Sequence, residues 1–158
     1  MSQESTTPDL EELARRSNEA FDRGDFDAAL AMYTPDAVWD MSSTGAGVFE
    51  GRDAIRSFWE DWFGAYQEWA HVIEEWHNLG NGVGLFVSLQ RGRPAGSSGF
   101  VELRYASVAL ARADGLAERI MIYTDIDAAR AAAERLAQER GRRVEAERRD
   151  RAQAASGT

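Results

Sequence analysis

The chain has 158 residues, of which 44% are hydrophobic and 10% aromatic, and this composition is typical of one globular domain with its own core. It contains no cysteine and no lysine, which excludes disulfides, thiolate nucleophiles, Schiff-base chemistry and cysteine-based metal sites. The net charge is −9, and residues 1–75 hold 17 acidic residues against 5 arginines. An acidic body repels nucleic acid and anionic lipid, so we expect a neutral small-molecule partner and no nucleic acid or membrane.

The hydropathy of the chain and its first eight residues indicate where in the cell we expect the protein. No stretch approaches the roughly 18 apolar residues of a membrane span, and residues 1–8 lack the basic and then apolar pattern of a signal peptide. We therefore expect a cytoplasmic protein that begins with a flexible leader over residues 1–8.

Two short helices are predicted before the first strand. Apolar residues recur at spacings of three and four over residues 10–21, and Gly24 ends this helix. Asp25 is expected to cap a second helix with an apolar face over residues 26–33. A Thr-Pro-Asp sequence then breaks the helical pattern and begins a strand over residues 37–41, which we expect at an edge of the sheet.

A loop and a third helix follow this strand. Residues 42–47 are small and flexible and are expected to form the loop. After Gly51, apolar side chains occur at offsets of 0, 3, 4, 7, 8 and 11, which is the pattern of a helix with one buried stripe. These side chains belong to Ile55, Phe58, Trp59, Trp62, Phe63 and Tyr66.

Four strands and a last helix complete the predicted order. The strands are expected over residues 70–79, 83–90, 100–112 and 116–124, with tight turns at Gly80-Asn81-Gly82 and Asp114-Gly115. From Asp125 the pattern is helical and rich in alanine, and beyond Gln138 the chain is too charged to bury. This order predicts an α+β fold in which a curved antiparallel sheet wraps over three helices, with an additional C-terminal helix. We expect the domain over residues 9–138 and a charged helical or disordered tail over residues 139–158.

Four segments of the chain form a recognisable series, namely FDRGDFDAALAMYTPDAVWD, FEGRDAIRSFW, the Asp114-Gly115 hairpin and IMIYTDIDAARAAA, in that order, over about residues 10–136. Their order and spacing resemble the SnoaL-like family of the nuclear-transport-factor-2-like superfamily. The resemblance implies a cone-shaped domain whose bent sheet and three helices enclose an apolar pocket, often as a homodimer packed through its sheets. The superfamily includes ketosteroid isomerases, polyketide cyclases, epoxide hydrolases and binding modules without enzymatic activity, so the fold leaves the function open.

The resemblance also suggests where catalytic groups would lie. In ketosteroid-isomerase-like members the general base is an aspartate at the end of the first strand, a position that Met41 occupies here. Asp40, one residue earlier, is expected to point away from the pocket because side chains alternate along a strand, although a bulge would turn it inward. The second isomerase position corresponds to Ser107, whose hydroxyl stabilises an oxyanion less than a protonated acid does. Asp40 and Ser107 are both candidate catalytic residues.

The other polar groups leave one more candidate. The charged residues of epoxide-hydrolase-like members are replaced by Phe-Val-Ser at residues 86–88 and by Ile122. His71 and His77 flank two glutamates, but six residues along a strand span about 20 Å, which is too far for one metal ion. His77 and Glu75 lie two residues apart on one face and form a candidate acid–base pair. We expect no metal and no cofactor.

Aromatic residues carry the clearest functional signal. Five tryptophans lie between residues 39 and 76, and each buried indole N–H requires a hydrogen-bond partner. An apolar pocket with a few polar groups is the usual form of a small-molecule site. The predicted ligand-binding residues are Tyr33, Trp39, Met41, Trp59, Trp62, Phe63, Phe86, Ser88, Tyr105 and Ile122.

Three functional hypotheses follow. The first is a domain that binds a hydrophobic, cyclic or aromatic small molecule. The second is a cofactor-independent isomerase, polyketide cyclase-like enzyme or hydrolase that uses Asp40, His77 or Ser107, and it requires an ionisable side chain in the pocket. The third is a dimerisation or partner module with a vestigial pocket, which predicts a small pocket and a large exposed apolar sheet face.

Overall fold

The computed structural model describes residues 9–157, so the predicted leader over residues 1–8 lies outside the described residues. The chain begins with helices α1 (Leu10–Asp22) and α2 (Phe26–Leu30), and an aspartate side chain caps the start of each. The second helix is shorter than predicted, because Tyr33 already belongs to strand β1 (Tyr33–Met41). Pro35 follows closely and disfavours a helical backbone at the residue before it, which explains the early change to extended structure.

A short strand that was not predicted follows the predicted loop. A 3-10 turn (Ser42–Thr44) follows β1, and the chain then returns as β2 (Gly47–Glu50), antiparallel to β1. Gly45 and Gly47 have φ angles of +84° and +102°, a left-handed backbone that lets the chain reverse within a few residues. Helix α3 (Arg52–Phe63) follows directly, and Ile55, Trp59 and Phe63 of its predicted stripe are buried.

Four further strands complete the sheet. They are β3 (Tyr66–Gly80), β4 (Val83–Pro94), β5 (Val101–Ala111) and β6 (Ala117–Tyr123). Strand β3 begins earlier than predicted, because α3 ends before Tyr66 and this tyrosine pairs with Pro94 of β4. The two glycine-containing turns lie where the sequence predicts them, between β3 and β4 and between β5 and β6.

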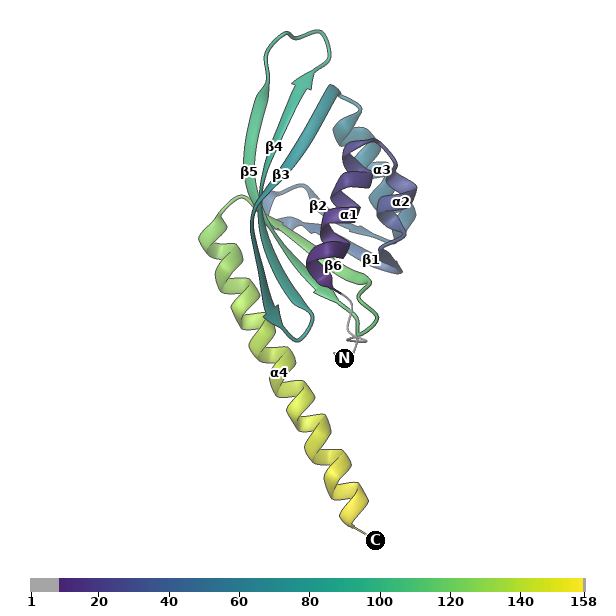
Figure 1. The fold of residues 1–158 in the computed structure, drawn as a ribbon, viewed down its shortest axis with the longest axis vertical. Coiled ribbons are helices and arrows are strands. Elements are labelled where there is room, and N and C mark those ends of the chain that lie inside the picture. The colour runs from purple at the N-terminus through teal and green to yellow at the C-terminus, as the bar shows by residue number, and fades with distance from the viewer. Residues whose placement is uncertain (1–8, 158) are drawn as a thin grey trace, which may run out of the picture.

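The strand order is β2-β1-β6-β5-β4-β3. Strand β1 therefore lies between β2 and β6, and the predicted edge position is wrong because β2 covers that side. Strand β1 pairs with β6 in parallel, whereas the other neighbouring strands are antiparallel. Bulges interrupt the register of β3 between Tyr66 and Glu68 and between Ile73 and Glu75, and bulges of this kind bend a strand. The sheet consequently curves around the first three helices (Figure 1).

The two faces of the sheet are covered by different elements (Figure 1). Helices α1, α2 and α3 lie on the concave face, where Phe21 and Trp59 belong to the main hydrophobic core. Helix α4 (Ile126–Ser156) packs on the opposite face, where a second core contains Ala133 of the helix and Val108 of the sheet. This arrangement confirms the predicted α+β fold, with a curved sheet over three helices and an additional C-terminal helix.

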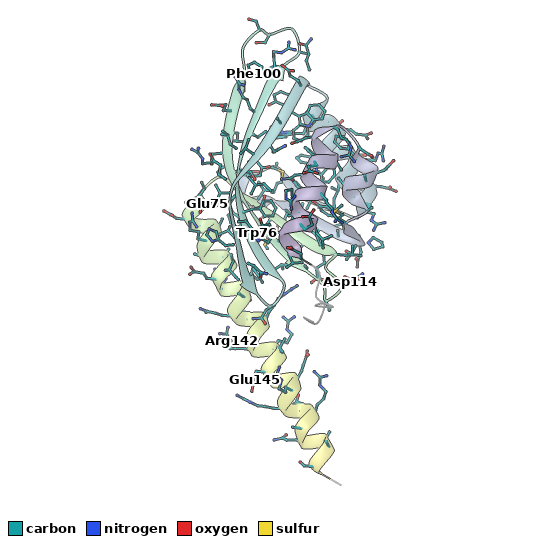
Figure 2. All side chains as sticks on the ribbon, viewed as in Figure 1. Glu75, Trp76, Phe100, Asp114, Arg142 and Glu145 are labelled. Carbon is teal, nitrogen blue, oxygen red and sulfur yellow. The ribbon has the colours of Figure 1, made fainter. Side chains whose placement is uncertain are left out.

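Helix α4 continues well beyond the sheet (Figure 1). Arg140 holds it to the hairpin tips by donating hydrogen bonds to the carbonyl oxygens of Asn81 at 3.1 Å and Ala111 at 2.9 Å. Residues 142–157 are all exposed, and Figure 2 shows Arg142 on the projecting part of the helix. The charged tail is thus helical as far as Ser156, while a domain boundary at residue 138 stays a prediction. None of the helices within residues 9–157 is both long enough and apolar enough to cross a membrane.

Ala133 tests the packing of α4 on the sheet, since its side chain is 0% exposed. We expect Ala133→Glu to lower the free energy of unfolding by about 3 kcal/mol or more, because a carboxylate would be buried there without a partner. Urea unfolding followed by circular dichroism measures the change. Ala131→Glu, on the exposed side of the same helix, is the control and should change stability by less than about 0.5 kcal/mol. Equal losses in the two variants would contradict this packing.

Candidate functional site

A cavity of about 230 Å³, called the main cavity below, lies between the helices and the concave face of the sheet. Most of the side chains that line it are apolar, and exposed residues such as Thr44, Ala46 and Leu103 mark its opening. Apolar hollows with a few polar groups are the usual form of small-molecule sites. Since a cavity of about 150 Å³ can hold benzene, the main cavity has room for a molecule of one or two rings.

Aromatic rings from α1, α3 and β1 form one wall of the main cavity. The ring of Phe21 meets Trp59 and Phe63 edge-to-face, at centroid distances of 4.9 and 4.6 Å. Trp39 meets Trp59 in the same way at 5.3 Å. Pairs of this kind contribute about 0.5–1.5 kcal/mol beyond the burial of their area, so the rings hold one another in place. The shape of the wall is therefore set by ring-to-ring packing.

The sequence predicts a hydrogen-bond partner for each buried indole N–H, and three indoles of this region lack one. The indole nitrogens of Trp39, Trp59 and Trp69 are sealed from solvent and have no hydrogen-bond partner among the residues that the structure describes. An unmade hydrogen bond of a buried group costs about 1–3 kcal/mol. Since these atoms are also sealed from the cavity, they do not act as donors to a ligand in this arrangement.

His71 enters the main cavity from β3, with Asp22 behind it. Asp22 ends α1, and its Oδ1 lies 2.6 Å from His71 Nδ1, while its Oδ2 accepts a hydrogen bond from the His71 backbone N–H at 3.0 Å. The His71 side chain is 4% exposed. When Nδ1–H donates this hydrogen bond to Asp22, the lone pair of an uncharged imidazole lies on Nε2. No hydrogen bond to Nε2 occurs among residues 9–157, and His71 lines the main cavity.

Three aromatic rings hold the imidazole of His71 from other directions. Phe21, Phe63 and Tyr105 meet it edge-to-face, at centroid distances of 5.4, 6.0 and 6.2 Å. The hydrogen bonds to Asp22 and these rings together determine the orientation of the side chain. A group that is oriented before a ligand arrives is preorganised for binding or proton transfer.

Further polar groups lie on the same side of the main cavity. Burial raises the pKa of Tyr33 and Tyr105 far above the usual value of a phenol, and the negative charge of Asp22 adds to the effect on Tyr105. Both hydroxyls therefore stay protonated and can donate a hydrogen bond. Gln90, which is 7% exposed and lies opposite His71 in the sheet, adds an amide group.

Eight of the ten predicted ligand-binding residues line the main cavity, namely Tyr33, Trp39, Met41, Trp59, Trp62, Phe63, Tyr105 and Ile122. Phe86 instead lines a smaller hollow beside it. Ser88 is fully buried next to the hydroxyl of Tyr105. The structure thus brings most of this set together around one space, and their contact with a ligand stays a prediction.

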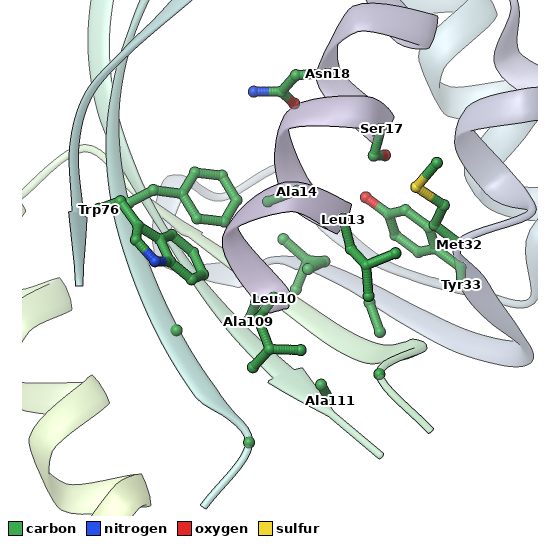
Figure 3. Close-up of a pocket in the computed structure, with 16 residues that line it drawn as sticks. Leu10, Leu13, Ala14, Ser17, Asn18, Met32, Tyr33, Trp76, Ala109 and Ala111 are labelled. Carbon is green, nitrogen blue, oxygen red and sulfur yellow. The ribbon is translucent and has the colours of Figure 1, made fainter. Parts of the chain in front are cut away.

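The smaller hollow, called the side cavity below, has a volume of about 70 Å³ (Figure 3). It lies between the first turns of α1 and the inner face of the sheet, with Leu10, Leu13 and Ala14 on one side. Trp76 and Phe86 close it on the other side. It is separate from the main cavity but adjoins it.

Two other kinds of site receive less support from the described part of the chain. A groove of about 500 Å³ lies between α4 and two hairpin tips, but Arg140 in its lining is already bound to protein oxygens. No cluster of three histidine or acidic side chains among residues 9–157 could hold a metal ion. The main cavity is therefore the site with the strongest combination of enclosure and polar groups.

The predicted catalytic residues His77 and Ser107 do not line the main cavity. His77 lies on the α4 side of the sheet, with Nε2 at 3.0 Å from Glu75, and Glu75 in turn forms an ion pair with Arg130 at 2.8 Å. Glu75 is labelled beside the start of α4 in Figure 2. Ser107 is buried in β5 without reaching the cavity. The predicted pairing of His77 with Glu75 exists, but on the opposite face of the sheet from the cavity.

Asp40, the third predicted catalytic residue, is also absent from the cavity lining, in agreement with the alternation of side chains along β1. Its Oδ1 accepts hydrogen bonds from the backbone N–H and the hydroxyl of Ser42, at 2.9 and 2.6 Å, and its Oδ2 pairs with Arg119. Partial burial opposes ionisation, but these bonds outweigh it and hold the pKa of Asp40 below its usual value. The carboxylate supports the pairing of β1 with β6.

The sequence does not show that Asp22 and His71 form a pair. They are 49 residues apart, so no local spacing reveals their contact. One signal does bear on His71. His71 follows Trp69 by two residues, and this spacing places both side chains on the same face of a strand.

The chain matches the SnoaL-like domain family over residues 14–120, which is more than half of its length. The protein belongs to the SnoaL-like family. A search among curated proteins finds no match. Because one fold carries many functions, family membership alone does not determine the activity of this SnoaL-like protein.

Solved structures with this fold include three informative neighbours. TerC, co-crystallised with polyporic acid, is 17% identical with a TM-score of 0.65, and the alignment covers 79% of this chain and 98% of TerC. An NTF2-like protein of unknown function from Burkholderia pseudomallei is 22% identical with a TM-score of 0.64, covering 78% and 94% of the two chains. A protein with a ketosteroid isomerase-like fold from Catenulispora acidiphila, in complex with trimethylamine, is 13% identical with a TM-score of 0.63, covering 71% and 84%. At these identities the likeness shows the fold alone.

Asp40→Asn tests the carboxylate that joins β1 to β6. We expect a loss of about 1 kcal/mol at pH 7, because the ion pair with Arg119 is partly exposed. The charged form is favoured in the folded state, so this contribution is present above the unfolded pKa of about 3.9 and is lost as the pH falls through the lower folded-state pKa. Urea unfolding at pH 7 and at pH 3 measures the difference. A loss that is as large at pH 3 or below as at pH 7 would contradict this assignment.

Proposed function

We propose that this SnoaL-like domain binds a small, largely apolar molecule of one or two rings in the main cavity. The observation that carries the proposal is a cavity of about 230 Å³ with an aromatic wall and a polar side formed by His71, Gln90, Tyr33 and Tyr105. Apolar surface supplies most of the affinity in such a site, and a few polar groups orient the ligand. TerC and the Catenulispora acidiphila protein have each been crystallised with a small molecule, which supports this use of the fold.

The partner-module alternative receives less support from the surface of the sheet. Much of its apolar outer face, including Val83 and Val108, is covered by α4 of the same chain. Beyond the helix Val72 is 58% exposed, but this face also carries ion pairs such as Arg104 with Glu74 at 2.6 Å. A homodimer through this face stays a prediction, and it would have to form around α4.

Ligand binding can be tested by thermal shift with 2-naphthol, indole and 2-tetralone. A compound at about 100 times its Kd stabilises the native state by about 2.7 kcal/mol, which corresponds to a rise in Tm of about 5–10 °C for a domain of this size. We expect Trp62→Ala to reduce the shift, because Trp62 lines the main cavity.

Trp69→Ala is the matched control for this experiment, since Trp69 packs against the same core but lines neither cavity. It should lower the Tm of the free protein while leaving the shift with ligand unchanged. If the ligand still raises the Tm of Trp62→Ala but no longer raises that of Trp69→Ala, the binding site lies elsewhere.

The Asp22–His71 pair favours a second candidate function, a cofactor-independent isomerase or cyclase. Nε2 of His71 can accept a proton from a carbon next to a ligand carbonyl, and Asp22 stabilises the imidazolium that forms. The electron pair left on the ligand moves to the carbonyl oxygen, where a hydroxyl of Tyr33 or Tyr105 can donate a hydrogen bond. Return of the same proton to another atom of the ligand completes an isomerisation.

Exchange of the carbon-bound hydrogens of 2-tetralone in D₂O, followed by NMR, tests this second candidate. We expect the protein to accelerate exchange next to the carbonyl, and His71→Gln to remove about 10²- to 10⁴-fold of that acceleration, the range typical of general acid–base groups. His77→Gln, at the histidine outside the cavity, should leave the rate unchanged. If His71→Gln abolished binding of 2-tetralone together with exchange, the histidine would be a structural residue and the proton-transfer proposal would fail.

A further inference from the structure

The main cavity and the side cavity share a boundary. Ser17, Asn18 and Tyr33 line both of them. The ring of Tyr33 meets Trp59 of the main cavity edge-to-face at 5.8 Å, and Figure 3 shows its hydroxyl directed toward Ser17. One tyrosine side chain with two polar neighbours therefore separates the two hollows.

Beyond this boundary the side cavity is apolar. Apart from the three shared residues, its lining consists entirely of apolar side chains and glycines. Water gains few hydrogen bonds in such a space, whereas an alkyl group that enters it leaves water without displacing polar contacts. A volume of about 70 Å³ accommodates two or three water-sized groups at about 30 Å³ each.

We propose that the two cavities form one two-part binding site. The ring system of the ligand occupies the main cavity, and an alkyl arm of two or three carbons passes Tyr33 into the side cavity. This inference rests on the proposed small-molecule function and names the ligand class, an alkyl-substituted compound of one or two rings. The polar groups of such a ligand lie on the His71 and Gln90 side, and its apolar arm lies under α1.

A series of 2-naphthols tests the two-part site, with hydrogen, methyl, ethyl or propyl at position 6. The two rings occupy most of the main cavity, so further carbons have to enter the side cavity to become buried. Isothermal titration calorimetry on the full chain should show an affinity that rises about fourfold per carbon up to propyl, which is the effect of about 0.8 kcal/mol per buried CH₂.

Two variants fill the side cavity from opposite sides, Ala14→Leu on α1 and Ala109→Val on β5. Neither residue lines the main cavity, so both variants should bind unsubstituted 2-naphthol as the wild type does. In each variant, the ethyl and propyl compounds should bind no more tightly than unsubstituted 2-naphthol. Ala131→Leu, on the exposed face of α4, is the control, and its affinity should increase with alkyl length as in the wild type.

The outcomes separate this inference from the proposed function. Suppose that 2-naphthol binds, but the affinity of the wild type does not increase with the length of the alkyl group, or increases equally in the variants with a filled side cavity. The two-part site is then wrong, while small-molecule binding stands. If no member of the series binds, the proposed function fails and the inference fails with it. If only one of the two filled variants folds, as judged by circular dichroism, that variant alone decides between these results.

Discussion

The packing of the Phe21 ring is the interaction on which the concave half of the structure depends. Phe21 lies at the end of α1 and contacts Trp59 and Phe63 of α3 and His71 of β3, at centroid distances of 4.9, 4.6 and 5.4 Å. It therefore joins two helices to the sheet. The next residue is Asp22, so the helix end that places this ring also places the carboxylate against His71. A shift of α1 would move the aromatic wall and the polar pair together.

The two faces of the sheet differ in how completely they are filled. Small alanine side chains of α4 approach the sheet closely, whereas the large rings on the concave face meet edge-to-face and leave the main cavity open. The open volume therefore follows from the packing of large rings on the concave face. An open space lined mostly by apolar and aromatic side chains has the usual form of a small-molecule site.

Environment distinguishes the two histidine–carboxylate pairs. His77 and Glu75 have side chains that are 49% and 42% exposed, and water weakens a pair of this kind. The His71 side chain is 4% exposed, and aromatic rings surround it. The imidazole is therefore oriented and shielded in the main cavity but exposed to water outside it, which is why only the first pair supports a role in proton transfer.

Local spacing in the sequence determined the helices, the two glycine turns, the buried stripe of α3 and most of the aromatic lining, because each depends on residues within one helical turn or one hairpin. The order of these elements predicted the α+β fold, and the family resemblance added the expectation of an apolar pocket. Only the tertiary structure decided the position of β1 beside β6, since the short, exposed strand β2 has no clear alternation. Alternation along β1 already directed Asp40 away from the cavity. Only the tertiary structure placed Asp22 against His71, put the His77–Glu75 pair on the α4 side of the sheet and left Ser107 out of the cavity lining. These features depend on which distant segments meet, and local spacing does not encode that.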